Sequence, residues 1–247
     1  MLHMFLGQSK TSHEPWYRLA IEEITGSIAR LESYPISNVI DQEKYDRLIT
    51  WCKGFTQTLC ELEQSMLCCV HFANQVNCGV SSQEEISSNM DYQRFVYFYK
   101  NALIRVFSLL DKAGYFLNEL FQLQTQLIKP RFSYFTMLRQ LEQFRQHEKL
   151  YHTLEQLKHE FQETLFRLRD QRNSEIHYTN IELITPLMEQ DVRLCHRFVP
   201  ELVSDHLKDL HQGFQMVCFT MIAIFQYTSS RDPKRERDVK REGDISK

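Results

Sequence analysis

The sequence contains few of the residues that make tight turns. Only 7 Gly and 6 Pro occur among 247 residues, and an all-β sandwich or barrel of this length would need more of both. The Gly-rich strings that cradle phosphate groups, GxxxxGK and GxGxxG, do not occur, which argues against a nucleotide-binding α/β enzyme. We therefore expect an all-α fold, and the chain is long enough for a well-buried core.

Neither sign of charge dominates the sequence. The formal net charge is -3 and the pI is about 6.4, which argues against a protein that coats nucleic acid through bulk electrostatics. Any nucleic-acid site must therefore be small and local. The first residues lack the basic region and long apolar run of a secretory leader, and the most apolar stretch, residues 214–225, is shorter than the roughly 20 residues that cross a bilayer. We expect a cytoplasmic protein without a membrane span.

The 7 cysteines include no CxxC pair. Cys68, Cys69 and Cys78 lie close to His71 in the sequence, but adjacent side chains on a helix point about 100° apart, so four tetrahedral ligands do not converge. An odd number of cysteines in a chain without a leader favours reduced thiols. We expect no disulfide, no bound metal and no cofactor.

Apolar residues recur at helical spacing along most of the chain. Thr11 or Ser12 before Pro15 marks one helix start, Asp41 another, and Pro130 a helix end. The predicted helices cover residues 11–34, 41–76, 91–127, 134–144, 149–170 and 204–228.

We expect these helices to form a single bundle domain over residues 1–229 with long central helices. The N-terminal helices at 12–78 are expected as an extension, and the core at about 91–228. Polar residues at 173–185 mark a helix end or a break. Residues 230–247 mix both charges without apolar periodicity, which predicts a disordered tail.

A polar motif, Arg-Asn-Ser-Glu-Ile-His, occupies residues 172–177. If this stretch is helical, Arg169, Asn173 and His177 lie at i, i+4 and i+8 and form one polar stripe, with Arg172 beside it and Tyr178 after it. Arg172 and His177 point about 140° apart on a straight helix, so a bend, a helix end or the reach of arginine must bring them together. The alternative is a helix terminus, where basic residues and amides satisfy the last carbonyl groups.

The Arg-Asn-x-x-x-His string at the end of a long helix resembles the signature of the HEPN superfamily (higher eukaryotes and prokaryotes nucleotide-binding). A second segment, residues 107–118, resembles a helix found in stand-alone bacterial HEPN families, and together the two pieces span about 95–178. The resemblance implies a helical bundle that dimerises so that two copies of the motif face one cleft. Active members of the family are metal-independent endoribonucleases, often toxins or antiviral effectors, whereas others are inactive binding modules.

By this resemblance, Arg172 and His177 are the expected catalytic residues, and Asn173, Arg169 and Tyr178 support them. A histidine can take or give a proton near neutral pH, and an arginine offers a fork of donors to phosphate oxygens. One chain supplies one such histidine, so two proton transfers call for a homodimer. Glu175 departs from this scheme, since a carboxylate repels phosphate unless it points away or pairs with an arginine.

The expected partners are a second copy of the chain, an RNA substrate, and a separate antitoxin or nucleotidyltransferase chain. Two alternatives stay open on the sequence. The first is a non-catalytic HEPN-like scaffold in which the same residues brace the dimer or a partner. The second is a helical, cofactor-free binding protein outside the family.

Overall fold

The computed structural model describes residues 14–33, 39–76, 89–177 and 192–230. Within these ranges there are seven α-helices, two short 3-10 helices and no strand, so the prediction of an all-α fold is confirmed. The elements are α2 (Pro15–Glu32), α3 (Val39–Val76), α5 (Met90–Phe121), η1 (Thr125–Leu127), α6 (Tyr134–Gln143), η2 (Arg145–His147), α7 (Glu148–Glu160), α8 (Gln162–His177) and α10 (Val192–Ser229).

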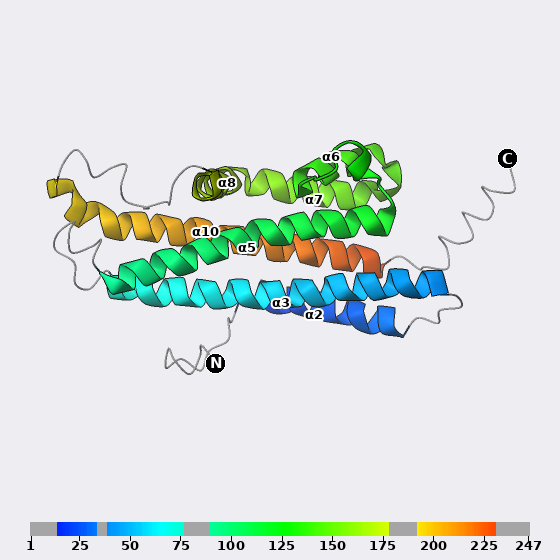
Figure 1. Ribbon diagram of the computed structural model, residues 1–247, viewed down its shortest axis with the longest axis horizontal. Coiled ribbons are helices and arrows are strands. Elements are labelled where there is room, and N and C mark those ends of the chain that lie inside the picture. The colour runs from blue at the N-terminus through cyan, green and yellow to red at the C-terminus, as the bar shows by residue number, and fades with distance from the viewer. Residues whose placement is uncertain (1–13, 34–38, 77–88, 178–191, 231–247) are drawn as a thin grey trace, which may run out of the picture.

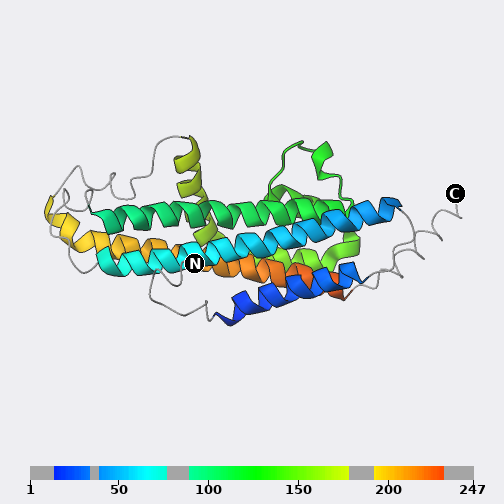
Figure 2. The same ribbon diagram turned by 60° about the horizontal axis from the view of Figure 1, so that its bottom comes forward.

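The helices form two layers (Figure 1). The long helices α3, α5 and α10 run lengthwise with α2 beside them, and the shorter helices α6, α7 and α8 lie on the other side of α5 and α10. Helix α10 contacts α2, α3, α5, α7 and α8, so it is the element that the two layers share. Figure 2 shows α2 on the side of the bundle opposite to the projecting part of α8.

Aromatic side chains hold the three long helices together. Phe55 of α3 is fully buried and meets the rings of Phe116 in α5 and Phe225 in α10 at centroid distances of 5.6 and 6.0 Å. These distances and the edge-on geometry are those that aromatic pairs favour, and burying each ring contributes roughly 2–3 kcal/mol. This cluster therefore fixes how α3, α5 and α10 meet.

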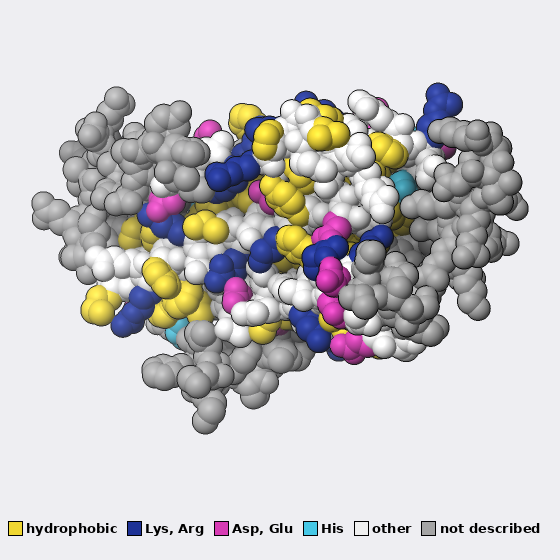
Figure 3. Space-filling model, turned by 45° about the vertical axis from the view of Figure 1, so that its right-hand side comes forward, with side chains coloured by type: hydrophobic (Ala, Val, Ile, Leu, Met, Phe, Trp, Pro, Cys, Tyr) yellow, Lys and Arg dark blue, Asp and Glu magenta, His cyan; other side chains and the backbone are white. Residues whose placement is uncertain are grey.

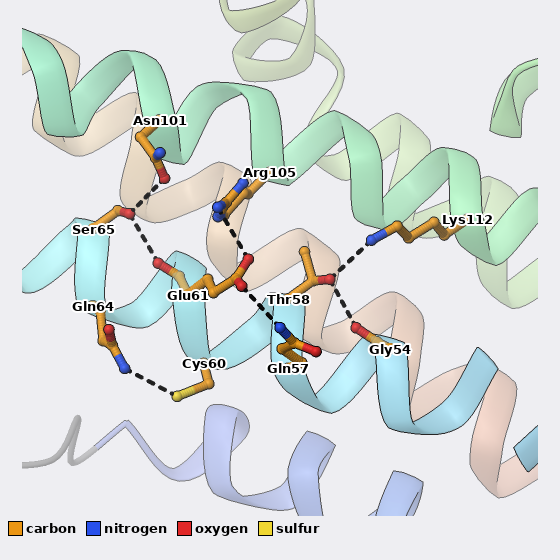
Figure 4. Close-up of polar contacts among 10 residues, drawn as sticks. All are labelled: Gly54, Gln57, Thr58, Cys60, Glu61, Gln64, Ser65, Asn101, Arg105 and Lys112. Atoms are coloured by element: carbon orange, nitrogen blue, oxygen red, sulfur yellow. Dashed lines mark hydrogen bonds and ion pairs between the residues drawn. The ribbon is translucent and has the colours of Figure 1, made fainter. Parts of the chain in front are cut away.

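A polar seam joins α3 and α5 at the edge of their interface (Figure 4). Arg105 pairs with Glu61 at 3.0 Å, Ser65 donates to Asn101 at 3.0 Å, and Lys112 donates to Thr58 at 2.9 Å. The α3 residues are spaced by three and four positions, and their partners run in the opposite direction along α5. Partly exposed pairs of this kind contribute little to stability, but together they favour one register of the antiparallel helices.

Helix α5 ends earlier than the sequence predicted. Its N-cap, Asn89, accepts the backbone N–H groups of Asp91 and Tyr92, which agrees with the predicted start at 91 to within one residue. The predicted end at 127 is wrong, because Gln122 adopts a left-handed conformation at φ 55° and the N–H of Leu123 bonds to the carbonyl of Asn118. This C-cap needs no glycine or proline, so the sequence gives little sign of it.

The predicted single helix at 149–170 is two helices. Helix α7 ends at Glu160 and α8 begins at Gln162, with Phe161 between them at φ -99° and ψ 15°. Phe161 is buried, and its ring lies 6.4 Å from that of Phe219 in α10. The bend at Phe161 allows α8 to leave the direction of α7 while staying packed on α10.

Close packing of α8 on α10 depends on Gly213. A Cβ atom at this position would lie 2.6 Å from Cδ1 of Leu168, which is well inside van der Waals contact. Leu168 is itself fully buried, so its side chain packs directly onto the α10 backbone at a position that only glycine leaves open.

The remaining boundaries differ in smaller ways. Helix α2 begins at Pro15 with Glu14 as its N-cap, not at Thr11 or Ser12, and Asp41 lies inside α3. Helix α10 begins at Val192, ahead of the predicted start at 204. Of the predicted tail at 230–247, residues 231–247 lie outside the described residues. Among the described helices, none is both long and apolar enough to cross a membrane.

Candidate functional site

The polar motif forms the last turns of α8. This helix continues to His177, beyond the predicted end at 170, and in Figure 2 its C-terminal part projects from the side of the bundle. The backbone therefore has the expected register, with Arg169, Asn173 and His177 at i, i+4 and i+8. The side chain of His177 and the whole of Tyr178 lie outside the described residues, so their roles stay predictions.

Arg172 turns away from this stripe and toward α5. Its guanidinium carbon lies 4.8 Å from the ring centroid of Phe107, within the range of a cation–π interaction. One terminal nitrogen donates to Oδ1 of Asn173 at 2.9 Å. The Nε atom is buried and has no hydrogen-bond partner among the described residues. Arg172 is thus half-buried where α8 crosses α5, and Asn173 orients its guanidinium.

The contact with Phe107 joins two separate pieces of sequence. Phe107 is the first residue of the segment 107–118 that resembles the family helix, and Arg172 is the first residue of the polar motif. The structure brings these two segments into direct contact. The sequence suggested both segments, but gave no indication of which of their residues touch.

Asp111 lies one turn after Phe107 on α5. Its Oδ1 accepts the backbone N–H of Tyr134, the first residue of α6, at 3.0 Å. Burial raises the pKa of the Asp111 carboxyl group, and the Tyr134 N–H and the nearby positive charge of Arg172 counter part of that rise. Asp111 therefore ties the start of α6 to α5 close to the motif.

Glu175 is paired in this structure. Its Oε2 atom lies 2.9 Å from Nζ of Lys100 on α5, and both side chains are largely buried. The partner is a lysine, where the sequence led us to consider an arginine. Because Lys100 balances its charge, Glu175 is compatible with an anion at the motif. No feature of the sequence singled out Lys100.

Other polar contacts anchor α8 upstream of the motif. Arg167 makes a two-pronged ion pair with Asp209 of α10, with both nitrogen–oxygen distances 2.7 Å. The hydroxyl of Tyr99 on α5 donates to Gln171, and burial raises the pKa of Tyr99. These contacts hold α8 against α5 and α10. The part of α8 just before the motif is therefore fixed on the bundle.

Three of the four α3 cysteines, Cys52, Cys68 and Cys69, are buried thiols. Cys68 and Cys69 are fully buried, and burial raises the pKa of Cys68 to about 11 and that of Cys52 to about 12. No group of three or more His, Cys, Asp or Glu side chains suited to a metal occurs among the residues that the structure describes. Cys78 lies outside those residues, so the absence of metal stays a prediction.

Comparison with known protein families gives a match over most of the bundle. A family model for HEPN-like domains covers residues 51–229, which is well over half of the chain. The matched range starts within α3 and ends with the last residue of α10, so it includes both segments that carry the resemblance and the helices around them. No curated protein and no solved structure matches the chain.

Proposed function

Because this chain belongs to the HEPN family, we propose that it is a metal-independent endoribonuclease that cleaves single-stranded RNA. The observation that carries the proposal is the helical course of the Arg-Asn-x-x-x-His motif at the projecting end of α8. There, Arg169, Asn173 and His177 share one helix face, and Arg172 lies beside them over Phe107. The reacting groups are Arg172 and His177 from each of two subunits.

The proposed reaction needs only protein side chains. One His177 takes the proton of a ribose 2′-OH as this oxygen attacks the adjacent phosphorus atom. The second His177 gives a proton to the departing 5′ oxygen, whose bond to phosphorus breaks. The two Arg172 guanidiniums stabilise the added negative charge of the phosphorane. The products are a 2′,3′-cyclic phosphate and a free 5′-hydroxyl.

The surroundings of Arg172 suit this role. Asn173 holds one guanidinium nitrogen at 2.9 Å, which limits the side-chain freedom that is lost when phosphate binds. Lys100 balances Glu175 at 2.9 Å, which lowers the repulsion of an RNA backbone. Asn173, Arg169 and Tyr178 are proposed as supporting residues.

A homodimer follows from this chemistry, since one chain has one motif histidine. Helix α5 offers a surface for the second copy beside α8. Lys100 and Phe107 contact α8, and Asn101 and Arg105 face α3. The surface of α5 between the residues that contact α8 and the residues that face α3 is a stripe with two large, exposed apolar side chains. They are Tyr97 and Ile104.

The second candidate function is a non-catalytic HEPN-like scaffold. It is favoured by the direction in which the motif side chains point, because Arg172 and Glu175 both reach toward α5. In this alternative, the two residues hold α8 on the bundle, and the family motif serves packing instead of chemistry. The two candidates differ in what substitution at the motif should change.

The deciding experiment is an RNA cleavage assay in EDTA with purified protein. We expect cleavage of single-stranded RNA with a 2′,3′-cyclic phosphate end, and no cleavage of DNA, which lacks the 2′-OH. His177→Ala should lower the rate by roughly 10²- to 10⁴-fold, and Arg172→Ala by a similar or larger factor.

His152→Ala is the matched control, because His152 is an exposed histidine of α7 outside the motif; it should cleave at the wild-type rate. If wild-type protein cuts no faster than His177→Ala, the nuclease proposal is wrong. If the substitutions instead lower thermal stability or dissociate the dimer, the scaffold function is supported.

A further inference from the structure

An open groove of about 670 Å³ lies in the angle between α6, α7 and α8. Phe135 and Arg139 of α6 line one wall, and Phe166 and Arg169 of α8 line another. Lys158, Arg167 and Glu163 complete the charged lining. The groove thus combines exposed cations with aromatic rings in a protein of net charge -3.

Two of the four cations in this lining are already paired. Arg167 is held by Asp209 at 2.7 Å, and Lys158 by Glu155 at 2.6 Å. Arg139 and Arg169 are exposed, and neither forms an ion pair with a carboxylate of the described residues. These two guanidiniums are therefore the groups that an anionic ligand would meet.

Phe166 supplies an exposed aromatic ring to the lining of the groove. Phe166 is 62% exposed, although burying such a ring would be favourable. The guanidinium carbon of Arg169 lies 5.8 Å from its centroid. An exposed ring next to an arginine is the combination on which proteins stack unpaired bases while binding the neighbouring phosphate.

The groove leads to the motif along one face of α8. Phe166, Arg169 and Asn173 are spaced by three and four residues, so they lie in one line on the helix surface. Seven residues of helix separate Phe166 from Asn173, a rise of about 10 Å. An RNA strand at the motif is thus within reach of the groove.

Figure 3 shows how charged side chains are distributed over one face of the molecule. On that face, Lys and Arg side chains alternate with Asp and Glu and with hydrophobic side chains. Mixed charge of this kind does not attract a polyanion. A local groove fits the expectation from the net charge that any nucleic-acid site is small.

We propose that this groove binds the single-stranded RNA that flanks the scissile phosphate, with a base stacked on Phe166 and the backbone held by Arg139 and Arg169. The proposal rests on the proposed ribonuclease function for the identity of the ligand. It adds a binding subsite that extends from the supporting residue Arg169 to Phe166 and Arg139, away from Arg172 and His177. The groove contributes affinity, and the motif contributes the chemistry.

Binding is tested apart from cleavage with a short, fluorescently labelled 2′-O-methyl RNA, which has no free 2′-OH to attack phosphorus. Phe166→Ala should weaken binding by about tenfold, as expected for the loss of one stacked base. The double variant Arg139→Gln/Arg169→Gln should also weaken binding. In a plot of log K against the logarithm of the salt concentration, it should lower the magnitude of the slope by about 1.4, the value for two lost phosphate contacts to a single strand. Phe166→Ala should leave that slope unchanged.

The control variant is Arg18→Gln/Lys53→Gln, which removes two exposed cations of α2 and α3. It should bind with wild-type affinity and salt slope. The inference is overturned if the groove variants bind like this control or if wild-type protein does not bind the RNA at low salt. It is also overturned if millimolar AMP displaces the RNA, because the groove would then be a mononucleotide site.

The two proposals fail in different ways. Groove-dependent binding of the 2′-O-methyl RNA with no cleavage of ordinary RNA would refute the nuclease function and leave the groove as an RNA site. Cleavage that depends on Arg172 and His177, combined with binding unaffected by Phe166→Ala and Arg139→Gln/Arg169→Gln, would refute the groove and retain the nuclease.

Discussion

Arg172 combines a structural contact with a charge at the motif. The ring of Phe107 covers one side of its guanidinium at 4.8 Å, and Asn173 holds a terminal nitrogen at 2.9 Å. Removal of the side chain therefore changes the packing of α8 on α5 as well as the charge available to a phosphate. A substitution that keeps the charge separates these two effects.

Arg172→Lys keeps the charge and loses the planar fork and much of the ring contact. We expect thermal stability to fall by the equivalent of about 1 kcal/mol, the size of a partly buried cation–π interaction. For a chain of this size that is a decrease in Tm of roughly 2–4 °C. RNA cleavage should fall much further, by about 10² or more, because lysine cannot bind phosphate oxygens in a bidentate manner.

Arg94→Lys provides the matched control. Arg94 also lies over a ring, with its guanidinium carbon 5.6 Å from the centroid of Phe72, but it is near the start of α5 and outside the motif. Its substitution should lower Tm by a similar amount and leave cleavage unchanged. Equal losses of cleavage in the two variants would mean that Arg172 acts through stability alone.

At the level of single residues, the sequence pointed to the motif but not to its neighbours. Arg172 and Asn173 were identified from spacing and from the resemblance to HEPN proteins. Lys100 and Phe107 could not be assigned to the site, because they reach it through the crossing of α5 and α8, and sequence periodicity does not specify a crossing point. Phe166 and Arg139, which line the groove proposed to bind RNA, were not singled out for the same reason.

Among the elements, the helices defined by long apolar periodicity were predicted well and their ends less well. The start of α5 and both bounds of α6 agree with the predictions to within one residue. The break at Phe161 was missed because apolar residues keep helical spacing on both sides of it, so that only the contact with Phe219 of α10 distinguishes two helices from one. The left-handed Gln122 was missed because this conformation is uncommon outside glycine and asparagine.

The contact between α8 and α10 gives a prediction at this scale. Gly213→Ala should lower the free energy of unfolding by up to about 2 kcal/mol. The added methyl group would lie 2.6 Å from Leu168, and this overpacking costs about 1–3 kcal/mol, against a gain of about 1 kcal/mol in helix propensity. Leu168 is fully buried, so it cannot swing into solvent to relieve the clash.

Gly54→Ala is the control for this measurement by thermal or urea unfolding. Gly54 is also helical, but a Cβ atom there would have no heavy atom within 4 Å. We expect this variant to be more stable than wild type by about 0.5–1 kcal/mol. If both alanine variants gained stability, the approach of α8 to α10 would be looser than the structure indicates.

For the whole molecule, the central question is how many chains build one site. The bundle has a continuous core that includes α2, α3, α5, α6, α7, α8 and α10, so a single chain has the means to fold. The motif, in contrast, provides one His177 and one Arg172 per chain. Folding and activity should therefore depend differently on association, and a substitution at the subunit interface can separate them.

Ile104→Glu tests this separation. Ile104 is 44% exposed on the α5 stripe beside α8, so a glutamate there is solvated in the monomer and costs little stability. At a dimer interface the same charge would be buried without a partner, which is strongly unfavourable. Light scattering should show wild-type dimers and Ile104→Glu monomers with nearly equal Tm values. The monomer should not cleave RNA, although Arg172 and His177 are intact.

Leu19→Glu is the corresponding control, because Leu19 is a similarly exposed apolar residue. It belongs to α2, the helix on the side of the bundle opposite to the projecting part of α8 (Figure 2). This variant should remain dimeric and active. A wild-type protein that is monomeric at high micromolar concentration and still cleaves RNA would refute the composite site. A dimeric and fully active Ile104→Glu variant would place the subunit interface on another face, since the charge would then stay in water.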